Sequence, residues 1–253
     1  MNAELRAAAP AVGPLWGELR YSAELASLLG DGRLRSPRRR ADAQPVLLIP
    51  GFMAGDSSLL VLREWLRKRG HRVAMSGIRW NVDCAERTVS RLQDVLADLA
   101  RDAGRPAAVI GQSRGGALAR SLAVREPERV SSLIMLGSPT LDPLAVAPQV
   151  LRTVRWMARL GDLRVPGVFS TRCRDGACCE AFNADMNRPL HPSIRTVAVH
   201  SRSDGIVDWR ACLDEHCEHV EVASSHCGMS VHPAVYRRLD EVLDETEARP
   251  WNG

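Results

Sequence analysis

The sequence is poor in aromatic residues and contains no long apolar run. Phe, Trp and Tyr make up 4% of its 253 residues, which argues against a nucleic-acid surface where aromatic and basic side chains alternate. No segment approaches the roughly 20 apolar residues that a transmembrane helix needs. Residues 1–10 include Glu4 and Arg6 and lack the continuous apolar core of a signal peptide. We therefore expect a cytoplasmic protein with no transmembrane segment and no nucleic-acid partner.

The chain also has no large excess of charge of one sign. The 34 basic and 30 acidic residues leave a net charge of +4, too small a surplus to call for a polyanionic partner. The one dense basic run, Arg38 to Arg40 with Arg33 and Arg35 nearby, lies in a stretch punctuated by proline and glycine. We interpret it as a solvated linker rather than an anion-binding arm. The 45% hydrophobic content is enough for one sizeable domain.

Cysteine is the residue present in excess, with seven copies. An odd count leaves at least one thiol free. Either one or two disulfides tie a loop near the active site, or the thiols are reduced and structural, and without a signal peptide we favour the second. The charged stretch 214–219 matches no strong zinc spacing, so we expect neither a metal nor a cofactor. The seven are Cys84, Cys173, Cys178, Cys179, Cys212, Cys217 and Cys227.

From Gln44 onward, short apolar runs alternate regularly with amphipathic stretches. This pattern predicts an α/β fold, a mostly parallel sheet of about six strands with helices on both faces. The predicted strands are 45–49, 71–75, 107–110, 130–136, 195–200 and 219–222, and the predicted helices are 57–70, 85–102, 114–125 and 233–245.

Two regions depart from the alternation. Residues 1–40 form an arm with one predicted helix, 15–29, and the basic linker, so the main domain spans 41–253. Residues 140–192 are an irregular insertion that we predict to be a cap or lid. Its predicted helix, 151–160, carries an apolar stripe that lines an acyl pocket or faces the core. The candidate substrate-binding residues are Trp156 and Met157 on this helix, together with Met53; the stripe also includes Leu151, Val154 and Leu160.

The sequence Gly111-Gln112-Ser113-Arg114-Gly115 fits the pattern G-x-S-x-G between a predicted strand and a predicted helix. That context is typical of a nucleophile elbow, a tight turn that presents the serine Oγ above the sheet. A side chain at 111 or 115 would collide with the turn and the neighbouring strand. The helix N-terminus also favours negative charge beside the serine. We therefore predict that Ser113 is a nucleophile.

A serine hydroxyl needs a base to accept its proton and a carboxylate to orient that base. The expected chain order is Ser, then Asp or Glu, then His. His226 follows the last predicted strand directly and is preferred over His232. The other five histidines fit less well by chain order or by surroundings: His71, His191, His200, His216 and His219.

Asp204 follows the predicted strand 195–200 and is the preferred acid, although Asp204-Gly205 is also a turn signal. Asp208 is the second choice. For the oxyanion we expect two backbone N–H donors, one from Arg114 and one from the turn after the first strand, with Phe52 preferred over Met53. The Arg114 side chain is either solvated or faces an acidic group of the insertion.

Five ordered motifs between residues 44 and 245 resemble the bacterial esterase/lipase branch of the α/β-hydrolases. The resemblance implies a Ser113–Asp204–His226 triad, oxyanion donors at Phe52 and Arg114, and no cofactor. Two departures stand out, because Pro50 replaces the usual His of the oxyanion turn and Gln112 replaces the usual His before the nucleophile. The motifs are residues 45–52, 111–116, 136–139, 201–207 and 224–229.

These residues predict hydrolysis of a carboxylic ester, with a small-molecule or lipid acyl ester as substrate. A thioesterase or acyltransferase would use the same triad, and so would a cofactor-free haloperoxidase. A non-catalytic protein that binds a lipid or a partner would need a missing or misplaced triad member. The oligomeric state is left open.

Overall fold

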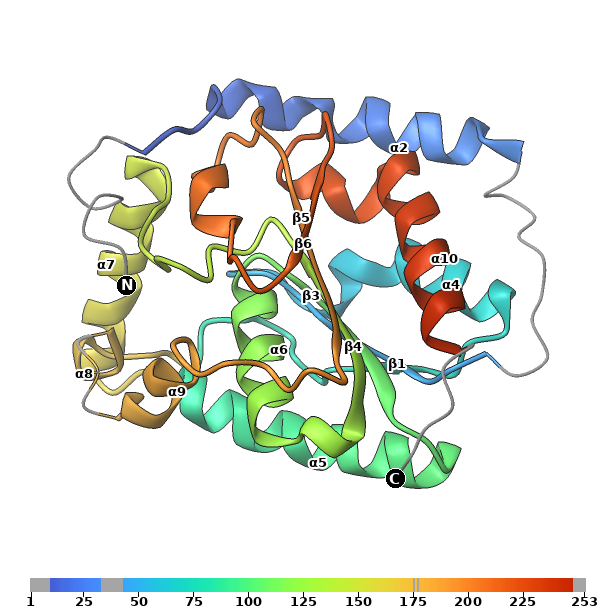
Figure 1. Ribbon diagram of the computed structural model, residues 1–253. Helices are drawn as coiled ribbons and strands as arrows, with labels where there is room; N and C mark the ends of the chain where they lie inside the picture. The colour runs from blue at the N-terminus through green and yellow to red at the C-terminus, as the bar shows by residue number, and fades with distance from the viewer. Residues whose placement is uncertain (1–9, 33–42, 175, 177, 248–253) are drawn as a thin grey trace.

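One parallel sheet of six strands runs through the computed structural model, which describes residues 10–32, 43–174, 176 and 178–247 (Figure 1). The strand order is β2-β1-β3-β4-β5-β6, and all five pairings are parallel. The predicted α/β fold with about six strands is confirmed. The strands are β1 (Val46–Ile49), β2 (Val73–Met75), β3 (Ala107–Gln112), β4 (Val130–Leu136), β5 (Arg195–His200) and β6 (Glu218–Glu221).

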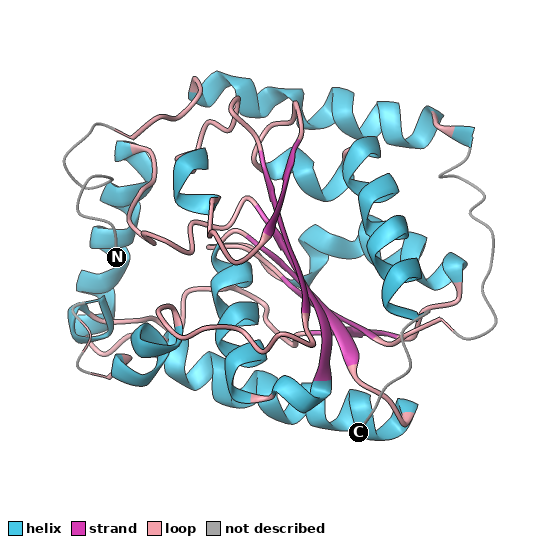
Figure 2. Cartoon of the chain, viewed as in Figure 1, coloured by secondary structure: helices cyan, strands magenta, loops and turns pink. Residues whose placement is uncertain are grey.

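Helices cover both faces of the sheet, as Figure 2 shows. On one face, α5 (Ala85–Ala103) and α6 (Arg114–Arg125) pack against the strands in one apolar cluster. On the other face lie α2 (Tyr21–Gly30), α4 (Leu60–Arg69) and α10 (Pro233–Glu247). The central strands β1 and β3 are buried along their whole length, which explains why they read as continuous apolar runs.

The N-terminal arm is part of the folded body. The predicted helix 15–29 is a 3₁₀ segment, η1 (Leu15–Arg20), followed directly by α2. Leu28 of α2 joins the apolar cluster beneath α4 and α10. The basic run 33–40 lies outside the described residues, so its interpretation as a linker stays a prediction.

The insertion between β4 and β5 contains three helices: α7 (Pro148–Asp162), α8 (Thr171–Arg174) and α9 (Glu180–Asp185). Its long helix extends beyond the predicted 151–160 at both ends, and at the N-terminal end Pro148 is compatible with the first turn of a helix. Short 3₁₀ segments lie in the connections between the strands and helices. They are η2 (Asp56–Leu59), η3 (Pro127–Arg129), η4 (Trp209–Cys212) and η5 (Cys227–Val231).

Within the described ranges, no helix combines the length and the apolar character needed to cross a bilayer. All seven cysteines lie in those ranges and are free thiols.

Candidate active site

Ser113 occupies a strained turn between β3 and α6. Its φ of 52° and ψ of −124° lie outside the regions that an L-residue normally adopts. The Ser113 N–H donates to the Leu136 carbonyl at 2.8 Å, and its own carbonyl accepts the Gly116 N–H at 2.9 Å. These bonds to β4 and to the first turn of α6 hold the strained residue, as expected for a nucleophile elbow.

The two glycines of the motif are required by close backbone approach. A Cβ at Gly111 would collide with the Gly115 carbonyl, and a Cβ at Gly115 would collide with the carbonyl oxygens of Ile49 and Pro50. The turn therefore packs directly on the end of β1. A side chain at 111 would push the start of α6 away from β3, and one at 115 would push it away from the end of β1.

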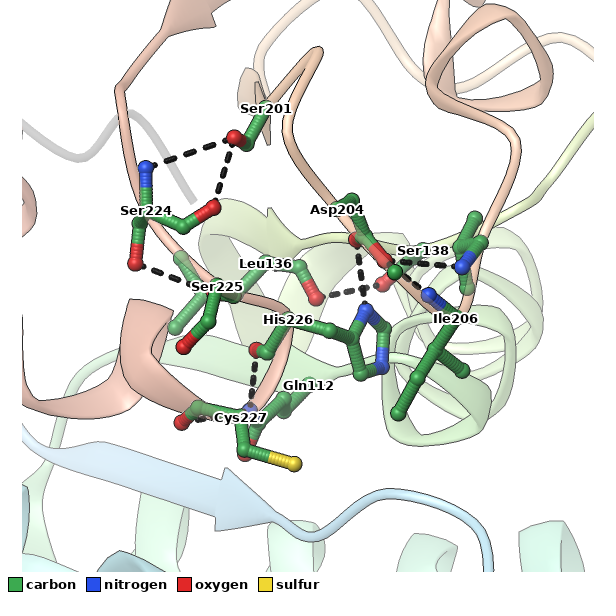
Figure 3. A network of polar contacts seen from close by, with 12 residues as sticks. Gln112, Leu136, Ser138, Ser201, Asp204, Ile206, Ser224, Ser225, His226 and Cys227 are labelled. Carbon is green, nitrogen blue, oxygen red and sulfur yellow. Dashed lines mark hydrogen bonds and ion pairs between the residues drawn. The ribbon is translucent and has the colours of Figure 1, made fainter. Parts of the chain in front are cut away.

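Asp204 and His226 meet above the carboxyl ends of β5 and β6. Asp204 Oδ2 lies 2.6 Å from His226 Nδ1 (Figure 3). The second oxygen, Oδ1, accepts the N–H groups of Ile206 and Val207, both at 2.8 Å, so the carboxylate is fixed. With Nδ1–H donating to Asp204, the lone pair of His226 is on Nε2.

The surroundings of His226 favour its protonated form. Burial acts to lower the pKa, but the charge and hydrogen bond of Asp204, together with the charge of Glu18, raise the pKa of His226 above its usual value. Both members of the pair are buried, with 5% of His226 and 2% of Asp204 exposed. Such an imidazole is well suited to accept a proton.

Ser113 and His226 line one cavity of about 770 Å³. Among the hydrogen bonds of the described residues none joins Ser113 Oγ to His226, whose ring contact is the one to Asp204. The rest of the wall is largely apolar. Side chains from the insertion between β4 and β5 supply much of it, among them Leu144, Val146, Val150, Val154, Phe169 and Phe182.

Phe52, Met53 and Arg114 also line the cavity. Met53, at φ 58°, donates its N–H to the Asn81 carbonyl at 3.3 Å, which favours Phe52 as the donor from this turn. Arg114 opens α6, where first-turn N–H groups have no partner within the helix. Phe52 and Arg114 thus both line the cavity that contains Ser113, and their N–H groups stay the predicted oxyanion donors.

The Arg114 side chain turns away from that space, and neither sequence-based alternative for it describes its surroundings. Its guanidinium donates to the carbonyls of Asn81 and Asp83 and to Asn81 Oδ1, and it lies over the ring of Phe169 at 5.7 Å. Burial lowers the pKa of Arg114 to about 10. Asn81 Nδ2 in turn donates to the Pro50 carbonyl at 2.7 Å, so the turn after β1 and the start of α6 are joined through Asn81.

The second-choice acid, Asp208, is engaged elsewhere. Its carboxylate accepts from the Arg210 guanidinium at 2.7 Å and from the Ala11 N–H at 2.9 Å. Burial acts to raise the pKa of Asp208, but the hydrogen bonds from Arg210 and Ala11 hold it below the usual value. The second-choice histidine, His232, uses Nδ1 to accept the Ala234 N–H at the start of α10.

The structure brings Met53 to the cavity but not the two candidate residues of the cap helix. Trp156 is 57% exposed, and Met157 is fully buried in a small cluster with Val82 and Phe169. Other positions of α7 line the cavity instead, including Val150 and Val154. Val154, Met157 and Leu160 of the predicted apolar stripe belong to this cluster, and which part of the stripe faces the cavity depends on how α7 docks.

Sequence reasoning missed two acidic residues of the N-terminal arm. Glu18 Oε1 accepts the N–H of His226 at 2.9 Å and of Gly205 at 3.0 Å, and its Oε2 accepts the Cys227 N–H at 3.0 Å. Glu24 accepts both the N–H and the hydroxyl of Ser225, at 2.7 and 2.6 Å. No local pattern connects residues so far apart in the chain.

Gln112 was noted in the sequence only as a departure from the usual histidine. Its Nε2 donates to the His226 carbonyl at 3.2 Å (Figure 3). The segment that carries His226 is therefore held from the β3 side by Gln112 and from the arm by Glu18 and Glu24.

Three solved structures illustrate the similarity of the fold. The mature Bacillus licheniformis lipase BlEst2 has a TM-score of 0.58 at 15% identity, covering 82% of this chain and 94% of that one. Esterase B from Lactobacillus rhamnosis HN001 has a TM-score of 0.60 at 16% identity, covering 83% and 78%. The thioesterase domain from the curacin biosynthetic pathway has a TM-score of 0.51 at 13% identity, covering 82% and 93%.

At these identities the structural neighbours establish the fold alone. No curated protein sequence matches the chain. The sequence profile of the family Hydrolase_4, described as serine aminopeptidase, S33, matches residues 67–206, more than half of the chain. The α/β-hydrolase resemblance seen in the motifs is confirmed, and the chain belongs to this hydrolase family.

Proposed function

We propose that the protein hydrolyses carboxylic esters through an acyl-enzyme formed on Ser113. The observation that carries the proposal is the 2.6 Å contact between Asp204 and His226 at the wall of the cavity that Ser113 also lines. An oriented imidazole beside a serine on a strained strand–helix turn is the arrangement that activates a hydroxyl.

The reaction proceeds in two steps. His226 Nε2 takes the Ser113 proton as Oγ attacks the ester carbonyl carbon, and the N–H groups of Phe52 and Arg114 stabilise the oxyanion. The tetrahedral intermediate collapses when the imidazolium gives its proton to the departing alkoxide. Water, deprotonated by the same nitrogen, then attacks the acyl-Ser113 carbonyl, and the carboxylic acid leaves as the proton returns to Ser113.

The cavity indicates an apolar acyl group. Its volume of about 770 Å³ lies within the range of small-molecule sites. Apolar side chains from the cap and the neighbouring loops surround the space in front of Ser113, among them Val150, Val154 and Phe182. Burying an apolar chain there contributes about 25 cal/mol for each Å² removed from water.

A panel of nitrophenyl esters of increasing acyl length tests the proposal, with Ser113→Ala as the matched inactive variant. We expect turnover by the wild type, a preference for apolar acyl groups, and loss of nearly all activity in the variant. A fluorophosphonate probe should label the wild type and leave Ser113→Ala unlabelled. Full activity of the variant would refute the mechanism, and an unreactive wild type would favour a non-catalytic binding protein.

The same assay format distinguishes two related activities, thioester hydrolysis and aminopeptidase activity. Acyl thioesters would be attacked by the same Ser113, so turnover of matched thioesters and esters compares the two leaving groups directly. The family description names an aminopeptidase, and amino-acid anilides test that activity. We expect esters to be the better substrates because the wall around Ser113 is mostly apolar. The N-terminal ammonium of a peptide would need a charged partner, for which Asp142 is the candidate in the lining.

A further inference from the structure

Four of the seven cysteines converge at the junction of the cap and α5. Cys84 lies at the N-cap of α5, Cys173 lies in α8, and Cys178 and Cys179 precede α9. Their sulfur atoms all lie within 4.8 Å of one another. We propose that Cys84, Cys173, Cys178 and Cys179 bind one zinc ion and form a structural site that fastens the cap to the body of the hydrolase.

The spacing of the sulfurs suits a metal better than a disulfide. Cys84 Sγ lies 3.4 Å from Cys179 Sγ and 3.9 Å from Cys178 Sγ, and the Sγ atoms of Cys178 and Cys179 are 3.9 Å apart. Tetrahedral zinc with Zn–S bonds of about 2.3 Å places its sulfurs about 3.8 Å apart. A disulfide would join only two of the four at about 2.05 Å.

Cys173 and Cys178 approach most closely, with their Sγ atoms 2.9 Å apart. They would separate by about 0.9 Å to reach tetrahedral spacing. Both belong to the short helical and turn segments of the cap, whereas Cys84 begins a 19-residue helix. The adjustment therefore falls on the cap side. The same closeness makes this pair the natural competitor, a Cys173–Cys178 disulfide, which the experiment has to distinguish.

Two cationic side chains and the N-terminus of α5 lie beside the four sulfurs. The guanidinium groups of Arg114 and Arg87 are near enough to interact electrostatically with Cys84 and Cys173, and the N-terminus of α5 adds positive potential at Cys84. Ser170 Oγ lies 3.7 Å from Cys173 Sγ. Hydrogen bonds of this kind to ligand sulfurs orient them and spread their charge.

The binding reaction balances without an oxidant. Four thiols and one Zn²⁺ give a tetrathiolate complex of charge −2 and release four protons to solvent. The two neighbouring arginines offset that charge. Four protein sulfurs complete the tetrahedron and leave no open position for substrate or water, which is the mark of a structural rather than a catalytic zinc.

The zinc site would affect the cavity without contacting the reacting atoms. Cys173 and Cys179 belong to the cavity wall, and Phe182 and Met186 of the same wall follow within a few residues. Metal bound here would link this wall to α5. Loss of the metal should therefore lower the melting temperature and weaken binding of large acyl groups more than of small ones.

Metal content is the first test. Wild-type protein made in zinc-supplemented medium and purified under reducing conditions should contain about one zinc per chain by mass spectrometry of the metals. Reconstitution of the metal-free wild type with Co²⁺ should give the intense visible absorption of tetrahedral thiolate cobalt. The cobalt spectrum uses the native chain, so it does not depend on whether any variant folds.

Variants assign the ligands. Cys84→Ser and Cys179→Ser should lose the metal, while Cys217→Ser, a buried thiol outside the cluster, should retain it. Wild type without zinc and without cobalt absorption would overturn the proposal. So would a Cys173–Cys178 disulfide found by non-reducing peptide mapping of fresh protein. Neither result bears on the Ser113 mechanism, which the ester panel tests separately.

Discussion

The carboxylate of Glu18 accepts the backbone N–H of His226 at 2.9 Å, across a separation of 208 residues. The same side chain also accepts the N–H groups of Gly205 and Cys227. One residue of the N-terminal arm thus contacts both segments that carry the proposed acid and base. The arm lies outside the motifs that resemble the esterases, yet it contributes directly to the geometry of the site.

Glu18→Gln removes this charge and one of the two carboxylate oxygens that accept N–H groups. We expect kcat to fall by about 10-fold or more, because the segment holding His226 loses part of its support. The midpoint of the acid limb of kcat/KM should move to lower pH, since the Glu18 charge helps to raise the pKa of His226. Glu215→Gln, at an exposed position, is the control. Unchanged rate and pH profile would show that the arm is only a structural cover.

The pH dependence follows from the raised pKa of His226. The base must be neutral, so kcat/KM should fall as pH decreases through a value above the ordinary histidine pKa of about 6.5. The stability effect has the opposite sense. A folded-state pKa above the unfolded one stabilises the protein fully below about pH 6.5, and this contribution is lost as pH rises through the folded value. Rate profiles and thermal melts of wild type and His226→Gln measure the two effects.

Asp204→Asn and Asp208→Asn distinguish the acid of the triad. The first removes the charge that orients His226, so kcat should fall by on the order of 10³-fold or more. The second disturbs contacts to Arg210 and Ala11 and should lower the melting temperature while leaving kcat within about threefold. If Asp208→Asn lowered kcat more than Asp204→Asn, Asp208 would be the acid of the triad.

Gly115→Ala tests the packing of the nucleophile turn. The added Cβ meets the carbonyl oxygens of Ile49 and Pro50, which are backbone atoms and cannot rotate away. We expect a loss of about 1–3 kcal/mol in the free energy of unfolding, measured by urea denaturation, and a fall in kcat. Gly30→Ala is the control, because a Cβ there meets nothing within 4 Å. Equal stability of both variants would contradict the close approach.

Two substitutions in α7 test which of its residues face the substrate. Val154 lines the cavity, so Val154→Trp should reduce kcat/KM for long acyl chains by about 10-fold while sparing acetyl esters. Trp156 is 57% exposed and lies outside the lining, so Trp156→Ala should leave the chain-length profile unchanged. A change of profile in the second variant alone would restore Trp156 as the substrate-binding residue proposed from the sequence.

The sequence by itself determined those features that depend on residues close together in the chain, namely strands, helices and tight turns. Apolar runs buried on both faces of the sheet identified β1, β3 and β4, and the glycines around Ser113 identified the turn that joins β3 to α6. Ser113, Asp204 and His226 could be proposed from the sequence because each follows the end of a predicted strand, and parallel strands bring their carboxyl ends to one edge.

Only the tertiary structure decided what depends on the docking of distant segments. The contact of Glu18 with His226, the turn of Arg114 toward Asn81, and the face of α7 that lines the cavity have no local signature. The four converging cysteines are divided between α5 and the cap, separated by up to 95 residues. Side chains that meet across such separations are brought together by the packing of the whole chain. Hydrophobic burial drives that packing without a preferred direction, so no pattern in the sequence marks which polar or thiol groups will meet.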